Sequence, residues 1–159
     1  MNLRSVAALI VCVALPLVVG ALGALGTLDG VQTWYPTLRR PSFAPPSWLF
    51  GPVWTTLYVM MGVASWLVWR EGAARPEVRS ALALYGIQLA FNLAWSWLFF
   101  GLRQPTAALV DIVVLLALIA VTAQRFAAVS RIAAMLMLPY LAWVAFATAL
   151  NAGFWWLNR

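Results

Sequence analysis

Five long apolar segments constrain the fold of this chain more than any other feature of its sequence. They run over about residues 5–28, 46–70, 79–102, 105–125 and 131–157. Each can cross the roughly 30 Å hydrocarbon core of a bilayer, which takes about 20 helical residues. Apolar residues make up 65% of the chain and charged residues 9%, against about 25% charged in soluble domains. The sequence therefore predicts an all-α, multi-pass integral membrane protein, with a single five-helix transmembrane domain over residues 1–159.

The first apolar segment also admits an interpretation as a signal peptide. Arg4 precedes it, and the small residues from Ala21 to Ala24 resemble a cleavage site. The segment is longer than the core of a signal peptide, which spans about 7–15 residues, and this favours a retained helix. Pro16 predicts a kink within it. The one long connection in the chain, over about residues 29–45, predicts a lid at one end of the bundle.

All ten basic residues of the chain are arginines, and they lie singly near the ends of the predicted helices. Arginines in such positions mark the membrane boundary and contact lipid phosphates, so membrane lipid is the expected partner and nucleic acid is not. Six fall at the end that carries the N-terminus, namely Arg4, Arg70, Arg75, Arg79, Arg125 and Arg131, and four at the other end, namely Arg39, Arg40, Arg103 and Arg159. This excess favours a cytoplasmic N-terminus in a bacterial cell membrane, without deciding between inner and outer membrane.

Conventional catalysis is the weakest interpretation of this composition. The chain has no histidine and one cysteine, Cys12, so it offers no Cys/His dyad, no zinc site and no histidine ligand for a haem iron. No metal and no cofactor is expected. Asp111 is the one acid inside an apolar segment. It either plays a structural role, satisfied by water, Arg103 or a tryptophan N–H, or it handles a ligand or a proton.

Aromatic and polar side chains share helical faces in three of the segments, which predicts an internal cavity. After the proline-rich run from Pro41 to Pro52, aromatic residues recur every fourth position and lie on one face. The amides and indole of the third segment form a strip of their own, and the fifth segment places an indole beside a small residue. These residues are Phe50, Trp54 and Tyr58, then Gln88, Asn92 and Trp95, then Tyr140, Trp143, Ala147 and Leu150. The amides either bridge helices or line the cavity.

A strip of small residues on the third segment predicts a helix contact. Gly86, Ala90 and Ala94 repeat every fourth residue, and small side chains let two helices approach closely. The contact is expected between the protomers of a homodimer.

The residues from Pro45 to Tyr58 carry a recognisable motif, Pro-Pro-x-x-x-Phe-x-x-x-Trp-x-x-x-Tyr. This motif and the segments 88–101, 108–111 and 138–151 resemble the tryptophan-rich sensory protein family, also called the translocator protein family, over nearly the whole chain. The resemblance implies a five-helix bundle, commonly a homodimer, that binds porphyrins, sterols and isoquinoline carboxamides beneath the first long loop.

The resemblance also implies which residues bind the ligand. Tyr35, Trp54, Asn92, Trp95, Trp143 and Ala147 match positions that line the pocket of the family. The full expected set is Tyr35, Arg39, Phe50, Trp54, Tyr58, Gln88, Asn92, Trp95, Trp143, Ala147 and Leu150. Arg39 or Arg40 would hold the carboxylates of a porphyrin. The family's sterol motif is incomplete, because Ala152 stands where it has tyrosine.

The expected function is a membrane receptor or transporter for porphyrins and related apolar ligands, with a regulatory role in tetrapyrrole or stress responses. The pocket is expected between the first, second, third and fifth helices, with the long connection as its lid. Two alternatives remain open. One is implied by the resemblance, because some bacterial members of the family degrade protoporphyrin in light. The two tryptophans tied to that activity match Trp54 and Trp143. The other alternative is a sterol or lipid carrier.

Overall fold

The computed structural model describes residues 3–159, and in this range the chain forms helices and connections without a strand. The long helices are α1 (Leu3–Leu25), α2 (Phe50–Arg70), α3 (Pro76–Ser96), α4 (Pro105–Val129) and α5 (Arg131–Leu157). All five are long and apolar enough to cross a membrane. The all-α five-helix bundle expected from the sequence is therefore confirmed.

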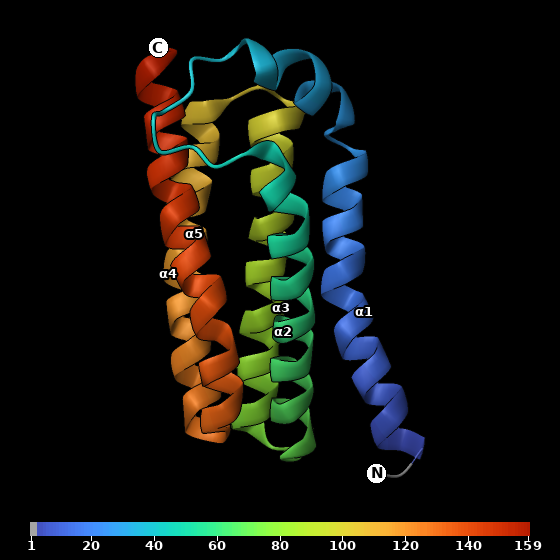
Figure 1. The fold of residues 1–159 in the computed structure, drawn as a ribbon. Coiled ribbons are helices and arrows are strands. Elements are labelled where there is room, and N and C mark those ends of the chain that lie inside the picture. Colours follow the sequence, from blue (N-terminus) through green and yellow to red (C-terminus); the bar gives the residue numbers. More distant parts are fainter. Residues whose placement is uncertain (1–2) are drawn as a thin grey trace.

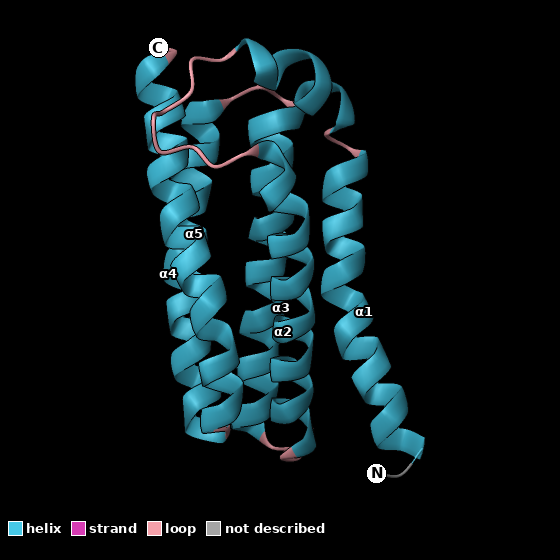
Figure 2. Cartoon of the chain, in the orientation of Figure 1, coloured by secondary structure: helices cyan, strands magenta, loops and turns pink. Residues whose placement is uncertain are grey.

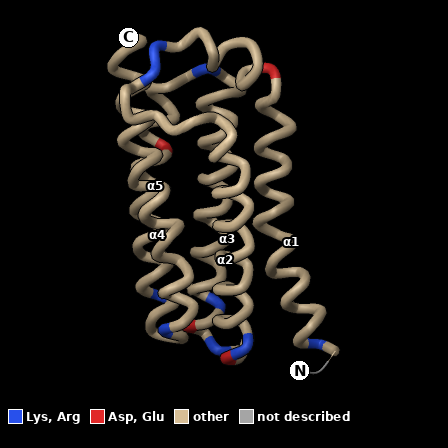
Figure 3. Tube along the Cα trace, in the orientation of Figure 1, with Lys and Arg blue, Asp and Glu red and all other residues tan. Residues whose placement is uncertain are grey.

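Helices α2 to α5 form a compact group, and α1 lies along one side of it (Figure 1). The most extensive packing joins α4 with α5, α1 with α2, and α3 with α4, and α1 also contacts α3. The two ends of the chain lie at opposite ends of the bundle, as an odd number of spans requires (Figure 1). The charged residues gather at these two ends (Figure 3), where helix ends would meet the membrane surfaces.

Local sequence signals explain most of the helix boundaries. Pro76 and Pro105 open α3 and α4, because the first turn of a helix does not need the N–H that proline lacks. Ser130 alone separates α4 from α5, and its side chain accepts a 3.4 Å hydrogen bond from the backbone N–H of Ala133. Helix α4 runs to Val129, beyond the expected end near 125, because Phe126 continues its buried face.

The connection between α1 and α2, which we call the strap (residues 26–46), is more ordered than a simple loop. A π-helical turn over Gly30–Trp34 and a 3-10 turn over Tyr35–Thr37 come first, and an extended run follows (Figure 2). A further 3-10 turn over Ser47–Leu49 leads into α2. The strap crosses the end of the bundle from α1 to α5 and returns to α2 (Figure 1). The predicted lid is thus partly helical.

Hydrogen bonds fix the strap at both of its ends. The Arg103 guanidinium donates to the Asp29 carboxylate at 2.7 Å, which joins the start of the strap to the α3–α4 connection. At its far end, the backbone N–H of Arg39 donates to Oδ1 of Asn158 at 2.9 Å, and Nδ2 of Asn158 donates to the Arg39 carbonyl at 3.1 Å. The strap is therefore held against the α3–α4 connection and the C-terminal end of α5.

Helix α1 contacts α2 through its backbone, next to the carbonyl that Pro16 leaves without a helical donor. Pro16 cannot donate to the carbonyl of Cys12, and a Cβ placed on Gly62 would lie 2.7 Å from that carbonyl oxygen and 2.5 Å from Cα of Val13. Only glycine lets α2 approach the α1 backbone this closely. The N-terminal half of α1 tilts away from the bundle beyond this contact (Figure 1).

Candidate ligand-binding site

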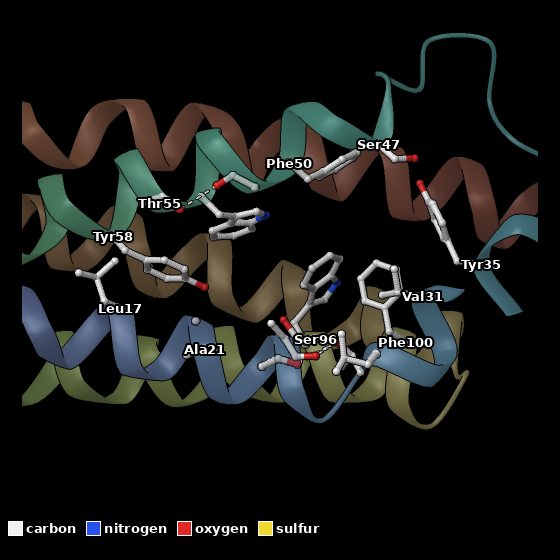
Figure 4. Close-up of a pocket in the computed structure, with 18 of the residues that line it drawn as sticks. Leu17, Ala21, Val31, Tyr35, Ser47, Phe50, Thr55, Tyr58, Ser96 and Phe100 are labelled. Carbon is white, nitrogen blue, oxygen red and sulfur yellow. Dashed lines mark hydrogen bonds between the residues drawn. The ribbon is translucent and has the colours of Figure 1, made fainter. Parts of the chain in front are cut away.

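A cavity of about 770 Å³ lies between α1, α2 and α3, beneath the strap (Figure 4). Tyr58 and Leu17 lie at its deep end, and Tyr35 lies toward the strap (Figure 4). The lining residues are Leu17, Gly20, Ala21, Gly23, Ala24, Thr27, Leu28, Val31, Tyr35, Pro36, Arg40, Ser47, Phe50, Gly51, Trp54, Thr55, Tyr58, Trp95, Ser96 and Phe100. Pockets for small organic ligands span about 300–1,000 Å³ and are mostly apolar. The cavity has the size and lining of such a pocket.

Two indoles form the aromatic wall of the cavity, and both are held in place. Trp54 stacks on Tyr58, with ring centroids 5.4 Å apart and planes 28° apart. Nε1 of Trp95 donates to Oδ1 of Asn151 at 3.0 Å, and its ring stacks on Phe99 at 5.7 Å. Flat apolar faces fixed in this way favour a flat apolar ligand.

A single charge stands at the strap end of the cavity. Of the described residues that line it, only Arg40 is ionised. Its guanidinium donates to the Pro45 carbonyl at 3.0 Å and lies 5.8 Å from the centre of the Tyr35 ring. Burial raises the pKa of the Tyr35 hydroxyl, and the neighbouring Arg40 opposes that rise without cancelling it. Tyr35 therefore remains a neutral hydrogen-bond donor at physiological pH.

The expected contribution of α5 lies in a separate, much smaller cavity of about 30 Å³. Trp143, Ala147 and Leu150 line this space and do not line the large cavity. Phe50 and Trp54 line both, and Phe50 packs edge-on against Trp143 with centroids 5.9 Å apart. Trp54 and Trp143, which are expected in one cavity, both line this small cavity, and of the two only Trp54 also lines the large one.

The amides of α3 bridge helices and line neither described cavity. The Tyr58 hydroxyl donates to Oδ1 of Asn92 at 2.8 Å, and Nδ2 of Asn92 donates to the Tyr140 hydroxyl at 3.1 Å. The Tyr140 hydroxyl in turn donates to Oε1 of Gln88 at 2.9 Å. We call Tyr58, Asn92, Tyr140 and Gln88 the buried amide chain. Gln88 and Asn92 therefore bridge helices in the structure and do not line the cavity, which were the two interpretations of these amides.

Several other residues singled out in the sequence do not line the cavity. Arg39 does not line it, because its backbone is bonded to Asn158 and the next residue, Arg40, points to the cavity instead. Arg103 is not the partner of Asp111, because Arg103 pairs with Asp29. Oδ2 of Asp111 is buried and has no hydrogen-bond partner among residues 3–159. The strip of small residues on α3 faces outward for most of its length. Gly86 and Ala90 are exposed on the outer face of α3, and Ala94 is half-buried.

The first helix is expected to bound the pocket, but its lining residues were not identified from the sequence. Its small residues Gly20, Ala21, Gly23 and Ala24 line the cavity, whereas the same run resembles a cleavage site when the sequence is considered alone. A run of small residues facing the aromatic face of another helix is the signal that predicts such a wall. Helix α1 supplies the space and α2 supplies the rings.

Comparison with known proteins agrees with this architecture. The sequence model of the TspO/MBR family matches residues 12–157. The chain is 45% identical over 148 residues to the tryptophan-rich protein TspO of Chlorobaculum tepidum, covering 93% of this chain and 94% of the relative. It is 48% identical over 123 residues to the human translocator protein, covering 77% and 73%. It is 38% identical over 133 residues to the tryptophan-rich sensory protein of Cereibacter sphaeroides, covering 83% and 81%. This chain is a multi-pass integral membrane protein and belongs to the TspO/MBR family.

Proposed function

We propose that this protein is a membrane receptor or transporter that binds porphyrins and related flat, apolar ligands in the cavity between α1, α2 and α3. The observation that carries the proposal is the cavity itself, about 770 Å³ in volume, with two indole faces and one arginine. A metal-free porphyrin presents a large aromatic face and carboxylates at one edge. The faces of Trp54 and Trp95 suit the ring, and Arg40 suits the carboxylates.

A regulatory role is part of the proposal. One relative carries the printed name tryptophan-rich sensory protein, which fits a protein that reports on its ligand. The strap supports this role, because it covers the cavity and contributes Tyr35 and Arg40 to it. A ligand whose carboxylates bind Arg40 would compete with the hydrogen bond from Arg40 to the Pro45 carbonyl within the strap. Because the strap is bonded to the α3–α4 connection and to the end of α5, such a change could reach both of them. A bacterial cell membrane is the proposed location. A sterol is the proposed competing ligand.

The first prediction is that Trp54→Phe weakens the binding of metal-free protoporphyrin. Aromatic pairing beyond area burial is worth about 0.5–1.5 kcal/mol, so the dissociation constant should rise by up to about tenfold. Titration of the detergent-solubilised protein in the dark, followed by quenching of tryptophan fluorescence, measures this. Trp48→Phe is the matched control, because Trp48 is 73% exposed and lines neither described cavity.

Equal affinities for the parent, Trp54→Phe and Trp48→Phe would remove Trp54 from the site. Absence of saturable quenching in the parent would overturn the proposal itself. Repeating the titration in light tests the alternative of a porphyrin-degrading enzyme, which the exposure of the Trp54 indole to the cavity favours. Loss of porphyrin absorbance that requires the protein and Trp54 would support degradation. Displacement of the porphyrin by a sterol would support the other alternative, a sterol or lipid carrier.

A further inference from the structure

We infer that the cavity opens sideways into the bilayer, between α1 and α2, and that its ligand enters from the hydrocarbon layer. The opening, which we call the lateral window, is bounded by Ala21 and Ala24 of α1 and by Gly51 and Thr55 of α2. The inference rests on the proposed function, because it concerns the route by which a porphyrin reaches the cavity. The argument comes from the contacts that close the side between α1 and α3, the deep end and the strap end.

The side between α1 and α3 is closed by direct contact. Nε1 of Trp97 donates to the carbonyl of Leu22 at 3.4 Å. A Cβ on Gly26 would lie 2.6 Å from the Trp97 ring, and a Cβ on Gly23 would lie 3.4 Å from Oγ of Ser96. Gly23 of α1 and Gly26 at the start of the strap thus let this side of the chain lie directly against Ser96 and Trp97 at the end of α3, which leaves no passage for a ligand.

The deep end of the cavity is closed by Tyr58. Its ring lies against Gly20 of α1 so closely that a Cβ there would overlap it, and its hydroxyl is bonded to Asn92 of α3. One side chain therefore spans from α1 to α3. Below it, the backbone contact between Gly62 and Cys12 and the 3.1 Å hydrogen bond from Nε1 of Trp66 to the Ser5 carbonyl hold α1 against α2.

The strap closes the end of the cavity that faces water. Its ion pair between Asp29 and Arg103 and its paired hydrogen bonds between Arg39 and Asn158 fix both flanks. Gly30 also packs directly on the backbone carbonyl of Phe100. Entry from water would require these contacts to break together.

The lateral window has no comparable closure. Ala21, Ala24, Gly51 and Thr55 are exposed although they line the cavity, and a Cβ on Gly51 would meet no atom of the described residues within 4 Å. Oγ1 of Thr55 donates to the Gly51 carbonyl at 2.9 Å, so its polar atom is satisfied within the helix. The rim therefore presents small and apolar groups to whatever lies outside it.

The depth of the lateral window matches the interior of a bilayer. The α2 span begins at Ser47, and Thr55 lies eight residues further on. At 1.5 Å per residue this places Thr55 about 12 Å below the start of the span, within a hydrocarbon core of about 30 Å. A ligand passing through the window would keep its ring among acyl chains and its carboxylates near Arg40 at the strap. Amphiphilic molecules dissolved in the membrane are the class of ligand that fits this route.

A pair of adjacent threonines provides the test. Thr55 and Thr56 are both exposed, and each donates to the carbonyl four residues earlier at 2.9 Å, but only Thr55 lines the cavity. The parent, Thr55→Phe and Thr56→Phe are reconstituted in phosphatidylcholine vesicles, protoporphyrin is added, and the rate of tryptophan quenching is recorded at several porphyrin concentrations. Thr55→Phe should slow association by about tenfold, equivalent to about 1.4 kcal/mol of added barrier, and Thr56→Phe should not.

An association rate for Thr55→Phe equal to that of the parent would overturn the lateral route. Faster association after Asp29→Asn, with no effect of Thr55→Phe, would show entry through the strap from water. If Thr55→Phe does not fold, Thr55→Cys in a Cys12→Ser background can be labelled after folding with a benzyl thiosulfonate, with Thr56→Cys as its control. Saturable equilibrium quenching in the parent supports porphyrin binding whichever association rate is observed. The proposed function and the lateral route can therefore fail separately.

Discussion

At the scale of single residues, the buried amide chain determines how the cavity wall is shaped. Tyr58 stacks on Trp54 at the cavity and bonds Asn92 behind it, so the position of the indole depends on an amide that does not line the cavity. Asn92 in turn relies on the Tyr140 hydroxyl, which is fully buried between α3 and α5. Asn92 and Tyr140 thus orient residues that line the cavity.

Tyr140→Phe is expected to destabilise the bundle, because it leaves Nδ2 of Asn92 without its acceptor. An unsatisfied buried donor costs about 1–3 kcal/mol, whereas hydrogen bonds between membrane helices average about 0.6 kcal/mol. We expect a loss of about 1 kcal/mol in the free energy of unfolding, measured by titration with a denaturing detergent.

Tyr85→Phe is the matched control for this change. Tyr85 is also a buried tyrosine of the core, and its hydroxyl has no hydrogen-bond partner among the described residues. Removing that hydroxyl should leave the free energy of unfolding unchanged or raise it. Equal losses for the two variants would show that the buried amide chain contributes nothing specific.

At the scale of helices, packing uses small residues in two ways. Where Gly62 meets Cys12, glycine lets α2 contact α1, and where Gly26 meets Trp97, glycine lets the start of the strap contact the end of α3. Gly86 and Ala90 of α3 are different, because they face outward and a Cβ on Gly86 would meet no described atom within 4 Å. This face remains a predicted contact between two copies of the chain.

Ala90→Leu should therefore shift a detergent-solubilised dimer toward monomer, because the larger side chain keeps two α3 helices apart. Analytical ultracentrifugation at several protein concentrations measures the shift, and porphyrin binding should persist because the cavity lies on the other side of α3. Ala117→Leu on α4 is the control, since Ala117 is also exposed. A dimer equally stable in all three proteins would place the interface on another helix.

At the scale of the whole molecule, the distribution of arginine predicts orientation. Six arginines lie at the end that carries Arg4, and four at the strap end, where Asp29 pairs with one of them (Figure 3). Positive charge is retained on the cytoplasmic side, so the strap and the C-terminus should lie on the opposite side.

Reporter fusions in a bacterial host test this orientation. Alkaline phosphatase fused after Arg159 should be active, because it folds only outside the cytoplasm, and green fluorescent protein at the same point should stay dark. The same reporters fused after Gly72, in the turn between α2 and α3, should give the opposite result. A fluorescent C-terminal fusion would reverse the predicted orientation.

The amino-acid sequence by itself determined the number and type of the helices and the family. A segment in lipid must satisfy its backbone hydrogen bonds internally, so about 20 apolar residues in a row are enough to predict a spanning helix. Its caps are local as well, as Pro76, Pro105 and Ser130 show. The aromatic face of Phe50, Trp54 and Tyr58 was also predictable, since it depends only on the period of one helix.

Only the tertiary structure decided which of these faces share a cavity. Sequence periodicity says nothing of how two helices are rotated against each other, so the absence of Trp143 and Ala147 from the large cavity could not be predicted before α5 was placed. The choice of Arg40 over Arg39 depends on how a proline-rich strap turns between Asn158 and Pro45. The small residues of α1 acquired their meaning only once α2 lay beside them, because a cavity wall is a property of two surfaces and not of either one alone.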